Sequence, residues 1–122
     1  MSDVMRLRPA VISAHGTPPK QISEFIGLAS TAEDDLSLAL MRSPAGWTEP
    51  AQVTQFAETT VVIEGAVVLH LDGGEALTVP AGEAVTVPPG VEVRYETPGP
   101  AVYVSLCRPA FSPARLRREH DG

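Results

Sequence analysis

The sequence predicts an all-β chain that folds as a single sandwich or barrel. Its 122 residues suffice for one modest core and leave no room for a second. About eight short segments, apolar or alternating, follow one another at spacings of roughly 8–12 residues, which is typical of antiparallel sandwiches and barrels. Twelve prolines and ten glycines separate these segments, as short strands joined by tight turns require.

The first half of the chain contains four predicted strands. Residues 21–29 and 35–42 alternate large apolar side chains with smaller or polar ones at a period of two. Residues 43–46 read Ser-Pro-Ala-Gly, which predicts a turn. Two further strands are expected at 52–55 and at the β-branched run 59–63.

The second half contains the clearest hairpin signal. Residues 66–71 are largely apolar, residues 72–75 read Asp-Gly-Gly-Glu and tolerate positive φ, and residues 76–79 return. Three more strands are expected, separated by proline and glycine turns: 84–87, 91–97 and 101–107. One short helical turn is expected from Pro113 onward. We therefore expect an N-terminal arm at 1–20, a barrel at 21–108 and a C-terminal tail at 109–122.

Composition and charge limit the classes of partner and the cellular compartment that we expect for the chain. A formal net charge of -6 argues against a nucleic-acid partner, which needs a basic stripe. No apolar run approaches the roughly 18 residues of a membrane span. The first eight residues lack the apolar stretch of a signal peptide, and Cys107 is the only cysteine, so we expect a reducing cytoplasm. We expect the basic residues Arg115, Arg117 and Arg118 to form a solvated tail.

The predicted strands 61–63 and 67–71 are apolar on both faces. One sheet should therefore have its outer face covered as well as its inner face. A second copy of the chain is the simplest cover, so we expect a homodimer.

Two blocks of the sequence share a fixed spacing of glycines, prolines and polar residues. The first is Gly46-x5-Gln52-x-Thr54-x3-Glu58-x6-Gly65, and the second is Gly82-x5-Pro88-x-Gly90-x2-Val93. These spacings resemble the two motifs of the cupin superfamily. The resemblance implies a jelly-roll barrel, the cupin-type double-stranded β-helix. Residues 41–47 and 106–113 are also similar to segments of small single-domain cupins such as the ethanolamine-utilisation Q-type.

The resemblance also identifies a metal site whose histidines are missing. Its members hold a divalent transition metal with three histidines and a glutamate, at the positions occupied here by Gln52, Thr54, Glu58 and Val93. Only Glu58 is a strong anionic ligand, and valine cannot coordinate a metal. His15, His70 and His120 lie outside the motifs, and we expect them on the surface. We therefore expect no metal and no cofactor, with an atypical metal site on Glu58 and Gln52 as an alternative.

Glu58 is the candidate catalytic residue if it keeps the inward direction that the resemblance implies. A positioned carboxyl group can act as a general acid or base, which contributes about 10²–10⁴-fold to a rate. Tyr95 is a second candidate catalytic residue, with a core tyrosine whose hydroxyl is hydrogen-bonded as the alternative. Other pocket residues are expected from the strand pattern: Gln52, Thr54, Thr60, Val62, Val91 and Val93. The alternative is that Glu58 is solvated near the mouth of the barrel and has no chemical role.

Four more residues are candidates around the expected pocket, and two of them have two readings. Trp47 could cover the mouth and stack on a planar ligand, or it could pin the adjacent turn. Arg42 could bind a substrate carboxylate, or pair with a nearby glutamate. Tyr103 and Cys107 share one face of the strand 101–107, which could line the pocket. Cys107 is expected to be a small buried side chain without a catalytic role.

These observations predict a metal-independent cupin that binds a small organic molecule in its barrel. An isomerase, a lyase or a cyclase is the enzyme class that acid–base help from Glu58 would suit. Two alternatives stay open, namely a non-catalytic binding or sensor module and a metal-dependent cupin with an atypical site.

Overall fold

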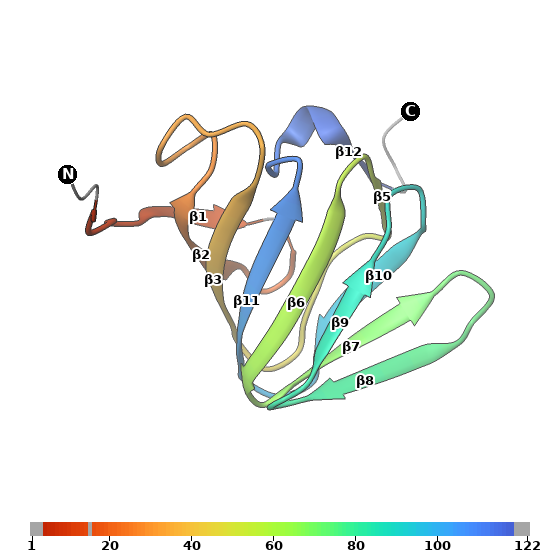
Figure 1. Ribbon diagram of the computed structural model, residues 1–122. Coiled ribbons are helices and arrows are strands. Elements are labelled where there is room, and N and C mark those ends of the chain that lie inside the picture. Colours follow the sequence, from red (N-terminus) through yellow and green to blue (C-terminus); the bar gives the residue numbers. More distant parts are fainter. Residues whose placement is uncertain (1–3, 15, 119–122) are drawn as a thin grey trace.

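The chain forms two antiparallel β-sheets that close around a common interior (Figure 1). This computed structural model describes residues 4–14 and 16–118. The first sheet consists, in spatial order, of β1 (Ala10–Ala14), β2 (Lys20–Ile26), β3 (Ser37–Ser43), β11 (Ala101–Arg108), β6 (Ala57–Glu64) and β9 (Ala84–Val87). The second consists of β12 (Leu116–Arg118), β5 (Gln52–Thr54), β10 (Val93–Thr97), β7 (Ala66–Leu71) and β8 (Ala76–Pro80), with β4 (Trp47–Thr48) paired to β10.

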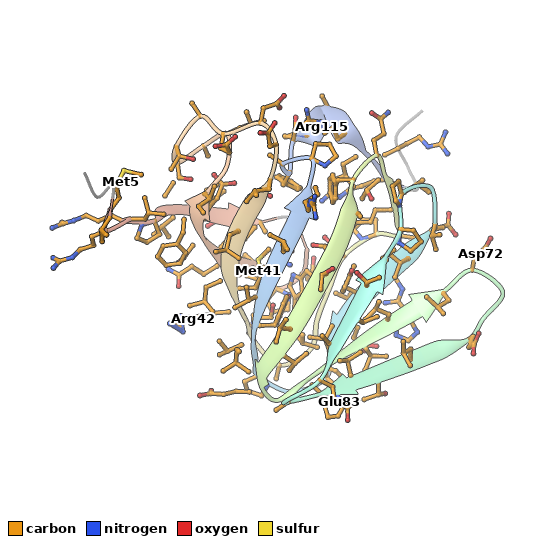
Figure 2. The ribbon with its side chains drawn as sticks, in the orientation of Figure 1. Met5, Met41, Arg42, Asp72, Glu83 and Arg115 are labelled. Carbon is orange, nitrogen blue, oxygen red and sulfur yellow. The ribbon has the colours of Figure 1, made fainter. Side chains whose placement is uncertain are left out.

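The predicted fold class is confirmed. The architecture is the all-β jelly roll expected for a single cupin domain. The 66–71 and 76–79 hairpin appears as β7 and β8, and Figure 2 shows Asp72 at the tip that joins them. The only helical element in the described residues is a 3₁₀ turn, η1 (Pro113–Arg115), at the place where a short helical turn was expected. No helix among these residues has the length and hydropathy needed to cross a membrane.

Two short edge strands are not visible in the sequence pattern. β1 pairs with β2 inside the predicted arm, and β12 pairs with β5 inside the predicted tail. Val11, Ile12 and Ser13 of β1 are all exposed, and β12 has only three residues. Neither segment therefore shows the apolar–polar alternation by which strands are recognised.

Strand alternation separates the interior from the outer faces. On β11 the buried residues Ala101, Tyr103, Ser105 and Cys107 alternate with half-buried Val102, Val104 and Leu106. Since side chains on a strand point to opposite faces in turn, the first set faces the interior and the second the outside of the sheet. β3 repeats this pattern, with Ser37 and Ala39 facing inward.

The hydrophobic core occupies only part of the interior. Its buried members are Trp47, Val62, Val67, Leu69, Val79, Val87, Val93, Tyr95, Ala101 and Tyr103. They come mainly from β6, β7, β10 and β11. The space next to β2 and β3 is left for a cavity.

The expectation that Val91 faces the pocket is wrong. Its side chain is 39% exposed. The ladder of β10 begins only at Val93, which pairs with Leu71 and Gln52. Val91 therefore lies between the turn at 89–90 and β10, where the alternation of the strand does not apply.

Candidate active site

A cavity of about 290 Å³ lies between the two sheets. Its walls come from β1, β2, β3, β6 and β11 on one side, and from β5, β10 and β12 on the other. Ligand pockets in proteins usually measure about 300–1,000 Å³. The cavity therefore suits a small ligand.

Glu58 projects into this cavity from β6. Its Oε1 accepts a hydrogen bond of 3.0 Å from the Tyr95 hydroxyl on β10. Its Oε2 accepts one of 2.5 Å from the Ser105 hydroxyl on β11, and the Cys107 thiol lies 3.8 Å from the same oxygen. Residues of both sheets thus hold the carboxylate in one orientation at the cavity wall.

Tyr95 stays protonated under ordinary conditions. Burial raises the pKa of its phenol well above the usual value, and the negative charge of Glu58 raises it further. The phenol is therefore a fixed hydrogen-bond donor toward the carboxylate.

Cys107 is a thiol without nucleophilic character. Burial, followed by the charge of Glu58, raises its pKa to about 12. Because the thiolate is the reactive form, a thiol with such a pKa does not serve as a nucleophile near neutral pH. The residue is free and buried.

A second group of charged residues lines another part of the cavity. Lys20 on β2 donates a hydrogen bond of 3.2 Å to the Tyr103 hydroxyl, and its Nζ lies 4.1 Å from the centroid of the Trp47 ring. Glu49 is buried and lies 3.7 Å from the Arg118 guanidinium. Burial raises the pKa of the Glu49 carboxyl, whereas the charges of Lys20 and Arg118 lower it. The net shift of this pKa is upward because the effect of burial outweighs that of the two cations.

Five of the predicted site residues line the cavity, namely Gln52, Glu58, Thr60, Tyr95 and Tyr103. They come from β5, β6, β10 and β11. The two candidate catalytic residues, Glu58 and Tyr95, are in direct contact.

Three predicted pocket residues lie outside the cavity lining. Thr54 is buried, and its hydroxyl donates a hydrogen bond of 2.7 Å to the Phe56 carbonyl oxygen. Val62 and Val93 belong to the hydrophobic core. These residues do face inward, but toward the part of the barrel that the core fills.

Arg42 and Trp47 do not take the ligand-binding positions considered for them. Arg42 is exposed and lies on the outer face of the first sheet, away from the cavity, because it alternates with the inward-facing residues of β3 (Figure 2). Trp47 is fully buried in the core and does not cover a mouth. The alternative reading of Trp47, a side chain that pins the turn before it, agrees better with this burial.

Several polar cavity residues escaped the sequence analysis, among them Lys20, Glu49, Ser105 and Arg118. Ser105 could have been found, because it lies midway between Tyr103 and Cys107 on the same face of one strand. Lys20 begins β2 one residue before the predicted strand and lines the cavity together with Ile22 and Glu24. Glu49 and Arg118 lie next to or on very short strands, whose sequence does not predict the direction of a side chain.

Arg117 is exposed, as expected for a solvated tail, but Arg115 and Arg118 differ from that expectation. Arg115 contacts Asp34 at 2.7 Å and the Ala110 carbonyl oxygen at 2.7 Å. Arg118 lines the cavity. Both are tied to the barrel because β12 joins the second sheet.

His70 lies at the surface, as expected, where its Nε2 contacts Glu96 at 2.6 Å and a third of its side chain is exposed. The expectations for His15 and His120 concern positions outside the described residues.

The four motif positions do not fit a transition metal. Both oxygens of Glu58 accept hydrogen bonds, the Thr54 hydroxyl is bonded to the backbone, and Val93 has no donor atom. In residues 4–14 and 16–118 there is no group of three or more His, Cys, Asp or Glu side chains that could hold a metal ion. Such a site normally needs three or four converging donors.

Residues 39–107 match the family described as the Cupin domain. The match covers more than half of the chain, and the chain belongs to this family. It is a small cupin in which the usual metal-binding histidines are missing from the motif positions.

Solved structures with the same fold come from several bacteria. One is a Streptomyces PAC13 variant with uridine, at 17% identity and a TM-score of 0.77, covering 96% of this chain and 91% of that one. A second structure of PAC13, which is described there as a unique nucleoside dehydratase, matches with a TM-score of 0.76. The putative ethanolamine utilization protein Q of Salmonella typhimurium matches at 15% identity and a TM-score of 0.67, covering 88% of this chain and 100% of that one. At these identities the likeness concerns the fold.

One curated protein is similar over most of the chain. It is named Endoribonuclease YbeY, from Myxococcus xanthus, and is 41% identical over 101 residues. The match covers 82% of this chain but only 34% of the relative. The chain therefore spans about a third of the length of the curated relative.

Proposed function

We propose that the protein binds a small organic molecule in the barrel cavity and that Glu58 acts on it as a general acid or base. The observation that carries the proposal is the Glu58 carboxylate, which faces the cavity between the Tyr95 and Ser105 hydroxyls. Two donors from different strands fix its direction. A group held in this way needs little reorganisation before it takes or gives a proton.

An elimination of water is the reaction that this arrangement suits best. Glu58 would take a proton from a carbon next to a carbonyl group, and the electron pair of that C–H bond would form the new double bond. The hydroxyl group on the neighbouring carbon would leave with a proton returned by Glu58, so that one water molecule is released. No oxidant or reductant is required. Tyr95 would hold the carboxylate in place as a hydrogen-bond donor.

The structural neighbours support this reaction class. The Streptomyces protein is described as a nucleoside dehydratase, and dehydration is an elimination of water. Since identity with it is 17%, the substrate of that protein is not transferred to this chain.

Other functions have weaker support. A ribonuclease activity would follow the name of a relative of which this chain spans a third, whereas a net charge of -6 does not favour RNA binding. A metal-dependent reaction would need donors that the motif positions lack. A non-catalytic binding or sensor module keeps the same cavity and is the main competing proposal.

Glu58→Gln tests the proposal, because glutamine keeps the size and polarity of the side chain but cannot exchange the proton. Uridine and a panel of small β-hydroxy aldehydes and ketones serve as probes, with binding measured by calorimetry and elimination by the absorbance of the conjugated product. For a probe that the wild type converts, we expect turnover to fall by about 10²–10⁴-fold and Kd to change little.

Glu64→Gln is the matched control, because Glu64 is an exposed carboxylate at the end of the same strand. It should leave turnover and Kd as in the wild type. Undiminished turnover in Glu58→Gln would refute the acid–base role. Tight binding without turnover by the wild type would favour the sensor alternative.

A further inference from the structure

The only lysine in the chain lies in the cavity. All eight other Lys and Arg residues are arginines, and Lys20 at the start of β2 points its ammonium group into the barrel. Lysine is normally a solvent-exposed residue. A half-buried ammonium group at a cavity wall therefore calls for an explanation.

Aromatic and hydroxyl groups hold this ammonium in place. Its Nζ donates to the Tyr103 hydroxyl at 3.2 Å, and that hydroxyl is bonded to the Ser43 hydroxyl at 2.8 Å. The rings of Trp47 and Tyr103 lie 4.1 Å and 5.4 Å away, at distances typical of cation–π contacts. These direct partners are uncharged, and the buried Glu49 carboxyl interacts with the ammonium through its charge without a direct contact.

Lys20 has hydrogen-bonding capacity left over. An ammonium group has three N–H donors, and the described residues provide one acceptor for it. Within residues 4–14 and 16–118, no carboxylate lies within 4.0 Å of its nitrogen. A ligand in the cavity could thus accept hydrogen bonds from the same group.

Lys20 shares a nearby carboxylate with a second cation. Glu49 lies 3.7 Å from the Arg118 guanidinium, and the charges of both Lys20 and Arg118 act on its carboxyl group. Glu24 also borders the cavity, but its Oε2 accepts bonds of 3.0 Å from the Ala29 and Ser30 amides. Its carboxylate is used to hold the loop after β2.

Lys20 and Glu58 reach the cavity beside different residues of β11. Lys20 contacts Tyr103, and Glu58 contacts Ser105 and Cys107. Tyr103 and Ser105 are two residues apart on this strand, or about 7 Å at the usual rise per residue. The ammonium and the carboxylate are therefore separate groups on the cavity wall.

We propose that Lys20 is the anchor of an anion-binding subsite, which takes a carboxylate or phosphate group of the ligand while the rest of the molecule extends toward Glu58. The inference rests on the proposed ligand-binding function and narrows the ligand class to small organic anions. A single ammonium group with N–H donors to spare matches one carboxylate or phosphate group.

Biosynthetic ¹³C-lysine labelling tests this subsite, because Lys20 is the only lysine and the label leaves its charge and its three N–H donors unchanged. Acetate and methyl phosphate are the probes, with glycerol as the neutral control at constant ionic strength. We expect the Lys20 ¹³Cε signal, assigned by its loss in Lys20→Arg, to shift saturably with at least one anion and not with glycerol. Which anion acts distinguishes a carboxylate ligand from a phosphate ester.

Lys20→Met should weaken binding of the active anion to the unlabelled protein by about tenfold or more, as expected for the loss of a charge-assisted hydrogen bond. Arg42→Met removes the same charge from an exposed position on the neighbouring strand and should change affinity less than twofold. No saturable shift in the wild type, or an equal loss in both variants, would overturn the proposal. Glu58→Gln should retain anion binding, so that a failure of the catalytic proposal is recognised separately.

Discussion

At the scale of single residues, the sequence predicted the position of Glu58. It predicted only some of the side chains around that carboxylate. The motif spacing placed it inside the barrel, and Tyr95 followed from the clean alternation of its strand. Ser105, which makes the shortest contact to the carboxylate, follows from the alternation of Tyr103 and Cys107 but was not identified. Glu49 and Arg118 could not be predicted, because they lie next to or on very short strands that pack by tertiary contacts.

The thiol of Cys107 gives a test of the charge at Glu58. With a pKa near 12 instead of 9.0, its thiolate fraction at pH 8 should be roughly a thousandfold lower than in the unfolded chain. We expect correspondingly slow reaction with a disulfide reagent in the native protein and fast reaction in denaturant. Glu58→Gln should speed up the native reaction, because it removes a charge that raises the pKa. Equal rates in the native and unfolded protein would contradict the buried setting of this thiol.

At the scale of elements, strands bounded by glycine and proline turns were predictable, whereas the edge strands β1 and β12 were not. β7, β8, β9 and β11 were identified within a residue or two, since glycine and proline turns bound them and their apolar residues are contiguous or alternate. β1 and β12 lack such a pattern, yet both contribute walls of the cavity. The elements that complete the site are thus those with the weakest sequence signal.

The connection between β6 and β7 needs a glycine at position 65. Its φ is +74°, and a Cβ there would overlap the Pro100 carbonyl oxygen. We expect Gly65→Ala to destabilise the fold by about 1–3 kcal/mol, measured as a lower urea midpoint at an unchanged m value. Gly46→Ala is the control, because Gly46 has a φ of +77° but open space around it. If both variants lost the same stability, the close approach to Pro100 would have no energetic role.

At the scale of the whole molecule, the cupin barrel has kept its cavity at a site whose motif positions no longer suit a metal. The fold class followed from segment spacing and motif resemblance together, because neither alone separates a jelly roll from other sandwiches. The homodimer and the cytoplasmic location stay predictions. The outer face of the first sheet retains exposed Val61 and Ile63, which agrees with the apolar pattern that prompted the dimer expectation.

The most direct test of the central claim is a crystal structure of the protein with a ligand in the barrel, either retained through purification or soaked in from the converted probe. The account predicts density in the cavity with a ligand atom within about 2.6–3.2 Å of a Glu58 oxygen, while Tyr95 still contacts the carboxylate. A ligand bound elsewhere, or a Glu58 side chain turned out to solvent when the cavity is filled, would contradict it.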